Sequence, residues 1–120
     1  MKLYRFHRCL WLLGLPLFLS FGYVLSGEGS DSELLDRARE LRTNEIFLES
    51  VRLYRAYIAE NPDDRSARLE LAGLLMKLDD PLAAANTLVP LLNEDPDDAE
   101  ARQKFDASLE ALGEAGVDAE

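Results

Sequence analysis

Hydrophobic residues between residues 32 and 112 recur every three or four positions, and short acidic segments separate the runs. This spacing places the hydrophobic side chains on one face of an α-helix. Between two such runs, Asp80 is a favourable N-cap and Pro81 suits the first position of a helix. The two runs consist of Leu71, Ala72, Leu75 and Leu78, and of Leu82, Ala84, Ala85, Leu88, Leu91 and Leu92. The pattern therefore predicts two consecutive helices.

Two acidic segments that contain proline mark further helix boundaries. Glu60–Asp64 reads ENPDD and Glu94–Asp98 reads EDPDD. Each proline ends the preceding helix, because the residue before a proline disfavours helical geometry. The aspartates that follow can cap free backbone N–H groups of the next helix and complement its dipole. Together these signals predict an all-α fold with helices at residues 32–43, 46–60, 64–78, 81–93 and 97–112.

The pattern repeats along the chain at the interval that separates Pro62 from Pro96. When the chain is aligned with itself at this shift, no gap is needed, small residues fall on small residues, and large residues fall on large ones. The aligned pairs are Ala38 with Ala72, Leu41 with Leu75, Ser50 with Ala84, Tyr54 with Leu88, and Tyr57 with Leu91. Such self-similarity is typical of stacked structural repeats.

The repeated residues resemble the tetratricopeptide repeat, a helix–turn–helix unit of about 34 residues. The resemblance covers about residues 31–112 and rests on Ala38, Ser50, Ala72, Ala84, Leu41, Tyr54, Leu75, Leu88, Pro62 and Pro96. It implies a helix–turn–helix solenoid of two units followed by a C-terminal capping helix. The chain departs from the family pattern early in the first helix of each unit. The usual large aromatic residue is Leu34 and then Arg68, and the usual glycine is Ala38 and then Ala72.

The repeat domain is expected to cover residues 33–112, with residues 113–120 as a flexible tail. A terminal helix with polar faces is how such solenoids often cover an exposed end. Two units and a cap are fewer than the roughly three repeats that stability usually requires. This shortfall is compatible with a homo-oligomer or with a stabilising partner.

Residues 1–26 differ from the rest of the chain and read as a targeting segment. The segment is basic at its start, and Cys9–Gly27 contains no charged residue. Two interpretations are open. A cleaved signal peptide could end at the small residues Val24 and Ser26. An uncleaved signal-anchor needs about 17–25 apolar residues, a length that this run reaches, and the run also has aromatic residues near both ends. We favour the anchor, followed by a linker at residues 27–32.

Both interpretations give the same topology. Lys2, Arg5 and Arg8 would stay in the cytoplasm by the positive-inside rule, so the acidic remainder would be exported. In a bacterium this describes a single-pass inner-membrane protein whose repeat domain faces the periplasm. Cleavage of the signal would instead leave a periplasmic or secreted protein.

Charge and side-chain chemistry narrow the function. Residues 27–120 contain 10 basic and 23 acidic residues, a net charge of −13. Nucleic acid is therefore not expected as a partner, because phosphate contacts need many lysines and arginines. The same residues contain no histidine or cysteine and no glycine-rich phosphate loop. We expect no catalytic residue, no metal site and no cofactor, and so no enzyme.

What remains is a binding surface. In tetratricopeptide arrays the first helices of successive units line a concave face that binds peptides or protein segments. By resemblance, this face would include Leu35, Asp36, Arg39, Arg42, Leu69, Glu70, Gly73, Met76, Lys77, Gln103 and Ala107. The partner-binding residues we select from it are Leu35, Arg39, Arg42, Leu69, Gly73, Met76, Lys77 and Gln103. Its three basic residues could hold a peptide carboxylate or acidic side chains, or they could be ordinary surface residues that pair with neighbouring glutamates.

The sequence thus indicates a non-enzymatic adaptor that holds a protein segment beside a membrane. The resemblance implies the class of small anchored repeat proteins that serve cytochrome c maturation, pilus and secretion systems, and envelope polysaccharide assembly. The alternative is an accessory structural subunit of a membrane complex, whose anchor helix rather than its concave face makes the key contacts.

Overall fold

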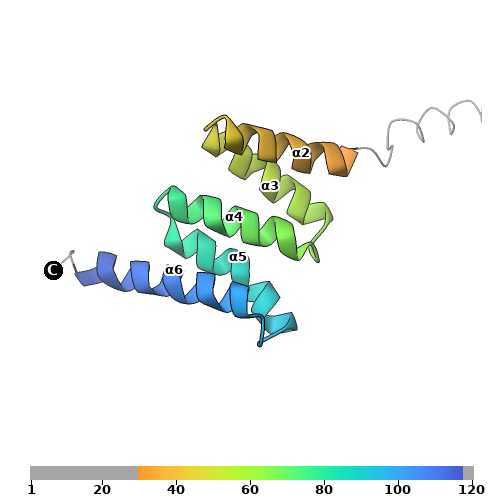
Figure 1. Cartoon of the computed structure of the whole chain (residues 1–120). Coiled ribbons are helices and arrows are strands. Elements are labelled where there is room, and N and C mark those ends of the chain that lie inside the picture. Colours follow the sequence, from red (N-terminus) through yellow and green to blue (C-terminus); the bar gives the residue numbers. More distant parts are fainter. Residues whose placement is uncertain (1–29, 118–120) are drawn as a thin grey trace, which may run out of the picture. The chain divides into compact units, whose positions relative to one another are not determined.

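The computed structural model of the chain describes residues 30–117, and every regular element in that range is a helix (Figure 1). The helices are α2 (Ser30–Thr43), α3 (Phe47–Glu60), α4 (Arg65–Lys77), α5 (Pro81–Glu94) and α6 (Ala99–Val117). The predicted all-α fold is confirmed for these residues. The first four helices begin and end within two residues of their predicted positions.

The two outer ends differ from the prediction. Helix α2 begins at Ser30, inside the segment predicted as a linker. Helix α6 continues to Val117, so the prediction that it ends near Gly113 is wrong. Neither Gly113 nor Gly116 has a positive φ, so neither adopts the left-handed conformation of a C-terminal cap. Each is simply tolerated inside the helix, at a cost of about 1 kcal/mol relative to alanine.

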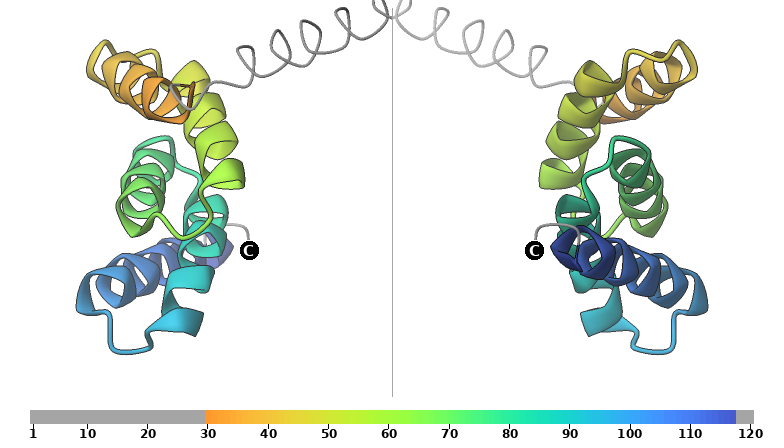
Figure 2. Two further views of the ribbon diagram at one scale, coloured as in Figure 1. Left: turned by 90° about the vertical axis from the view of Figure 1, so that its right-hand side faces the viewer. Right: turned by 90° about the vertical axis from the view of Figure 1, so that its left-hand side faces the viewer.

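The described residues from Asp31 onward form one compact unit, in which α2 packs on α3 and α4 packs on α5 as successive helical hairpins (Figure 1). The views of Figure 2 show two layers, with α2, α4 and α6 in one and α3 and α5 in the other. Helix α6 lies against the second hairpin and covers its outer side. This is the order of elements expected for a two-unit solenoid with a terminal cap.

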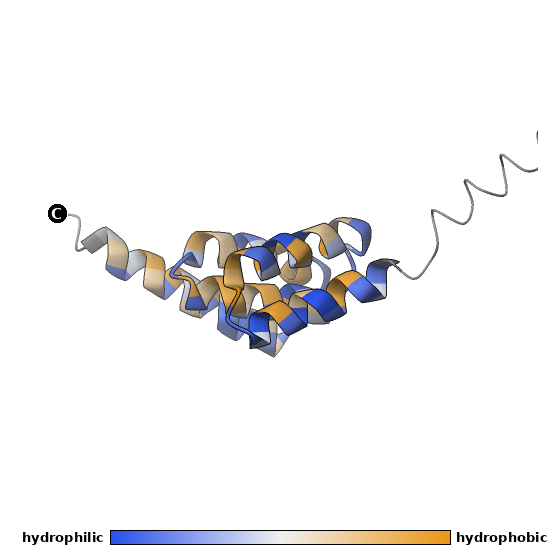
Figure 3. Ribbon diagram, turned by 90° about the horizontal axis from the view of Figure 1, so that it is seen from above, coloured by the Kyte–Doolittle hydropathy of each residue, from blue (hydrophilic) through white to orange (hydrophobic). Residues whose placement is uncertain are grey.

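The core is built from the positions that are equivalent in the two units. Ala38, Ser50 and Ala84 have no exposed surface, and Ala72 is 1 % exposed. These small residues let the two helices of each hairpin approach closely, and the Ser50 hydroxyl donates a 2.7 Å hydrogen bond to the Ala38 carbonyl across the first hairpin. The large core residues at repeated positions are Leu41, Tyr54, Leu75, Leu88 and Leu91. Figure 3 shows hydrophobic and hydrophilic residues alternating around the helices, as amphipathic packing requires.

The acidic turns cap helices as predicted. The carboxylates of Asp64, Asp80 and Asp98 accept from the backbone N–H groups of Ala67, Ala83 and Ala101 at 3.0, 3.2 and 3.1 Å. In each case the aspartate precedes the first helical residue and satisfies one of its free donors.

The turn within each hairpin uses the same backbone conformation in both units. Glu45 has φ 63° and Asp79 has φ 59°, and these two residues are equivalent in the alignment of the two units. Both lie in the left-handed region, which costs side chains other than glycine energy. The repeat thus extends to the conformation of single turn residues.

The family pattern has an aromatic residue at the position that Arg68 occupies here. Instead of packing a ring, Arg68 forms hydrogen bonds at this position. Its guanidinium donates to the Pro62 carbonyl at 2.9 Å and to the Thr87 carbonyl at 3.5 Å. One repeat later, Arg102 donates to the Pro96 carbonyl at 3.3 Å. The two arginines therefore fasten the acidic turns to the helices that follow them.

Within residues 30–117, no helix is both long and apolar enough to cross a membrane. The predicted signal-anchor at residues 1–26 lies outside the described residues.

Candidate partner-binding groove

An open hollow of about 560 Å³ lies on the layer formed by α2, α4 and α6. Helix α4 supplies its floor, α2 one rim and α6 the other. We call this hollow the α4 groove. It is lined by Arg42, Arg65, Ser66, Leu69, Glu70, Gly73, Leu74, Lys77, Glu100 and Lys104.

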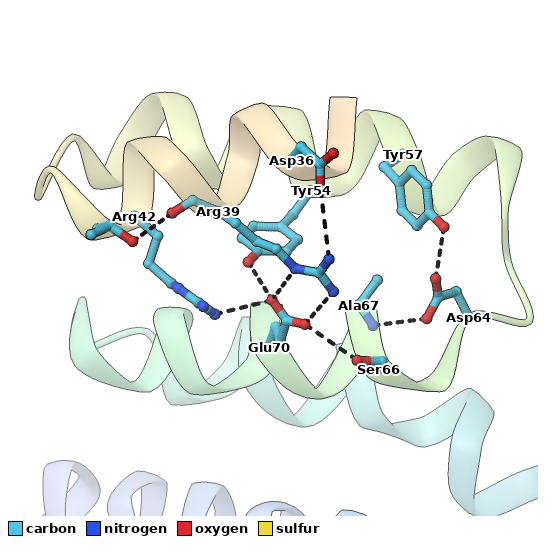
Figure 4. Close-up of polar contacts among 10 residues, drawn as sticks. Asp36, Arg39, Arg42, Tyr54, Tyr57, Asp64, Ser66, Ala67 and Glu70 are labelled. Carbon is cyan, nitrogen blue, oxygen red and sulfur yellow. Dashed lines mark hydrogen bonds and ion pairs between the residues drawn. The ribbon is translucent and has the colours of Figure 1, made fainter. Parts of the chain in front are cut away.

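Glu70 occupies one wall of the α4 groove and gathers the arginines of α2. Arg39 donates to both of its carboxylate oxygens, at 2.7 and 3.1 Å, and Arg42 donates at 3.2 Å. The Tyr54 hydroxyl donates at 2.6 Å from α3. Figure 4 shows these three side chains converging on Glu70 from the first hairpin. One carboxylate thus links all three helices α2, α3 and α4.

The electrostatics of this cluster follow from its geometry. The hydrogen bonds from Arg39 lower the pKa of Glu70 to about 2, with a further contribution from the Tyr54 hydroxyl, although partial burial opposes the shift. The same pairing raises the pKa of Arg39. Burial, together with the hydrogen bond to Glu70, raises the pKa of Tyr54. The cluster therefore holds one fixed negative charge between two fixed positive charges.

A second ion pair closes the far side of the groove. Arg65 donates to both carboxylate oxygens of Asp98, at 2.6 and 2.8 Å, and to Glu100 at 3.1 Å. The Arg65 guanidinium lowers the pKa of Asp98 to about 2. This arginine is consequently engaged with the turn before α6 and with the first turn of that helix.

The surroundings of the two lysines that line the groove differ from those of its ion-paired arginines. Among the described residues, neither Lys77 nor Lys104 has an acidic side chain within ion-pair distance. The Lys77 ammonium lies 4.6 Å from the centre of the Phe47 ring, a cation–π contact that leaves its charge uncompensated. The Lys104 ammonium lies 4.0 Å from where a Cβ on Gly73 would be. Gly73 itself is exposed, so bare backbone lies beside a free cation.

The structure brings four of the eight predicted partner-binding residues together in the groove. These are Arg42, Leu69, Gly73 and Lys77. The other four lie outside its lining, for different reasons. Leu35 is buried in the core. Arg39 is held by Glu70. Met76 is half-buried and receives the Ser108 hydroxyl at 3.3 Å from its sulfur. Gln103 is exposed on α6.

One interpretation of the two α2 arginines needs correction. On an acidic body, the gathering of Arg39 and Arg42 suggests that a negative group of a partner meets them. The structure supplies that group from the chain itself, because Glu70 pairs with both arginines. The alternative that these residues pair with a neighbouring glutamate therefore describes their resting state.

Sequence reasoning missed Lys104 as a groove residue. The repeat itself could have found it, because Lys104 is equivalent to Glu70 one unit later and so falls on the same face. Arg65, Ser66, Leu74 and Glu100 were also missed. Arg65 and Glu100 enter the groove through an ion pair that no spacing rule predicts.

Comparison with known proteins agrees with the fold. A family model described as "Tetratricopeptide repeat" matches residues 47–114, which is more than half of the 120 residues. The chain therefore belongs to the tetratricopeptide repeat family. Searches of curated proteins and of solved structures find no match. Domains of this family bind protein or peptide partners and are typically not enzymes, so the chain is a protein-interaction adaptor.

Proposed function

We propose that this protein holds an acidic segment of a partner protein in the α4 groove, beside a membrane to which residues 9–27 attach it. The observation that carries the proposal is the pair of lysines, Lys77 and Lys104, which line the α4 groove with exposed Gly73 and form no ion pair with any described residue. The remainder of the chain from residue 27 has a net charge of −13. Among the described residues, Arg55, Arg68 and Arg102 also form no ion pair with a carboxylate. Arg68 and Arg102 donate to backbone carbonyls, and all three lie outside the α4 groove. Lys77 and Lys104 line the same hollow.

The groove matches an extended acidic segment in several respects. Each lysine offers three N–H donors on a flexible stem, which suits carboxylates of variable position. Gly73 lets the backbone of a ligand approach α4 without meeting a side chain. Leu69 and Leu74 are buried beneath the hollow and give it an apolar floor. The ligand class we propose is a peptide segment with acidic side chains or a C-terminal carboxylate.

The proposed cellular location rests on the sequence of the targeting segment at residues 1–26, which we call the leader. The uncharged run at Cys9–Gly27 and the basic residues before it support a single-pass anchor with the repeat domain exported. In a bacterium the adaptor would act on the periplasmic side of the inner membrane. The family class of small anchored repeat proteins supports a role in assembling an envelope or cytochrome c maturation complex.

A cross-linked pull-down from native membranes tests the proposal. The variant Lys77→Gln/Lys104→Gln should recover the partner at least several-fold less well than the wild type, and raised salt should have the same effect, because exposed charges are screened. The control Arg37→Gln/Arg102→Gln removes the same charge from exposed positions outside the groove and should recover the partner normally. Equal recovery by both double variants would contradict a role for the groove.

The accessory-subunit alternative rests on the same leader, since an uncharged span from Cys9 to Gly27 with Trp11 near one end could itself contact partner helices. Substituting Trp11 and Leu13 separates the two functions. If these changes remove the partner while the lysine variant keeps it, the anchor helix is the binding element.

A further inference from the structure

The layer opposite the α4 groove carries an exposed stripe without charge. Helix α5 presents Leu82, Asn86, Val89 and Asn93 to solvent, at spacings that place them on one face. No residue from Pro81 to Asn93 is charged, in a chain of which 30 % is charged. Leu82 is 57 % exposed and Val89 is 38 % exposed. Surface of this kind is unusual on an acidic protein.

Helix α3 continues the same face at the equivalent positions one repeat earlier. Its exposed residues there are Leu48, Arg52, Arg55 and Ala59. Arg52 forms an ion pair with Glu49, and Leu48 is 82 % exposed. None of the eight residues on the two stripes is acidic. We call these eight residues the α3/α5 face.

A recess lies between the two helices on this face. It has a volume of about 540 Å³ and is lined by Arg55, Ile58, Ala59, Pro62, Arg68, Ala83, Asn86 and Thr87. Leu48 and Leu82 protrude from the face, and the recess could accommodate such side chains from a second copy. A self-complementary surface needs both features.

Charge decides which partner fits. Two copies of a body with a net charge of −13 repel each other. Repulsion is smallest where a surface carries no net negative charge, and the α3/α5 face is such a surface, because none of its eight residues is acidic and neighbouring Glu49 is paired with Arg52. A strongly basic partner protein would be drawn to the acidic turns instead. Protein interfaces are depleted of charged residues at their centre and enriched in arginine, which agrees with the uncharged α5 stripe and with Arg55 beside it.

Asn86 suits the centre of a symmetric contact. It lies midway along α5, and its side-chain amide can donate to and accept from the same group on a second copy. Paired asparagines fix the register of helix dimers in this way. Pro90 adds an acceptor at the same place, because it has no N–H and leaves the Asn86 carbonyl without its usual helical donor.

We propose that the α3/α5 face pairs with the same face of a second copy of this chain, with the two α5 helices meeting at Asn86. The pairing is weak. Each helix has 14 residues and is about 21 Å long at a rise of about 1.5 Å per residue. Two such helices side by side offer roughly 400 Å², about half of what each partner of a standard interface contributes. The proposal is independent of what the α4 groove binds.

Site-specific cross-linking of the full chain in its native membranes tests the pairing. Cys9 is the only cysteine, so Cys9→Ser provides a background into which Val89→Cys can be introduced, one helical turn from Asn86, which stays unchanged. A short thiol-to-thiol cross-linker should then give a dimer of this chain. Gln103→Cys places a cysteine at an exposed position on α6, in the other layer, and should give at least several-fold less dimer. If two copies associated only through the leader, the cysteine on α5 and the cysteine at position 103 should give similar amounts of dimer.

A second variant tests the chemistry of the contact. Leu82→Glu adds an acidic group to the face and should reduce the Val89→Cys dimer several-fold, while circular dichroism of the purified chain stays unchanged because Leu82 is at the surface. Three results would overturn the proposal: no dimer from Val89→Cys, equal dimer from Gln103→Cys, or a cross-link from Val89→Cys to a different protein.

Discussion

Replacing Glu70 with glutamine tests how the charged cluster in the wall of the α4 groove stabilises the fold. Glutamine keeps the size of the side chain and an acceptor for the Tyr54 hydroxyl, but it removes the negative charge that Arg39 and Arg42 share. The pKa of Glu70 is lowered from 4.5 to about 2. At about 1.36 kcal/mol per pKa unit, this shift corresponds to at most about 3.4 kcal/mol of folding free energy.

Solvent reduces that value. The Glu70 side chain is 21 % exposed, and those of Arg39 and Arg42 are 39 % and 38 % exposed. Ion pairs that water reaches contribute less than their geometry suggests, so we expect Glu70→Gln to cost about 2 kcal/mol at pH 7. The folded-state pKa is depressed, so the contribution is fully present above pH 4.5 and is lost as the pH falls towards 2.

Urea unfolding of a chain that starts at residue 27, followed by circular dichroism, measures the effect. The difference between wild type and Glu70→Gln should be about 2 kcal/mol at pH 7 and should shrink to well under 1 kcal/mol at pH 2, because protonated Glu70 is also neutral. Glu40→Gln is the control, since Glu40 is 56 % exposed and pairs only locally with Arg37; it should cost less than about 0.5 kcal/mol. A Glu70→Gln effect as small as the control, or one independent of pH, would refute this reasoning.

Three further predictions concern the repeat and the leader. Asp80→Ala should cost about 1 kcal/mol through the lost N-cap, and Ala84→Leu should cost more, about 1–3 kcal/mol, because Ala84 has no exposed surface; thermal melts that rank the two in the opposite order would contradict the helix register. Glu45→Gly should increase the free energy of unfolding by about 0.5 kcal/mol and so raise the melting temperature, because φ 63° strains a residue with a side chain but not glycine. No gain, or a loss as large as that of the mid-helix control Glu40→Gly, would argue against the turn conformation. N-terminal sequencing of the mature protein should find the leader retained, and a mature start at Gly27 would show that it is cleaved.

The fold was largely predictable because its signals are local and repeated. Aspartate before an apolar run, proline at a fixed position and helical spacing of hydrophobic residues each act within a few residues of the helix that they define. The interval between Pro62 and Pro96 then identifies which helices are equivalent. The end of α6 was mispredicted because Gly113 is a helix end only when it adopts a positive φ, and here it does not.

The groove was only partly predictable. Its position follows from the repeat, which places Leu69, Gly73 and Lys77 on the first helix of the second unit. Which group each charged side chain pairs with does not follow from the repeat, because the Arg39 guanidinium could bond equally well to a carboxylate of a partner or to Glu70. The choice depends on a contact between residues 31 positions apart, and the distance between side chains on stacked helices is a property of the packed structure.

The most direct test of the proposed function is to place a photo-activatable amino acid at Ser66, which is exposed and lines the α4 groove, and to map what it captures in native membranes. The proposal predicts a cross-link to one partner protein, within an acidic segment identified by mass spectrometry, and loss of that cross-link in the Lys77→Gln/Lys104→Gln background. The same photo-activatable residue at Asn93, on the other layer, should not capture that segment. A Ser66 cross-link to a segment without acidic residues, or one that survives removal of both lysines, would contradict the claim that the groove binds through its free cations.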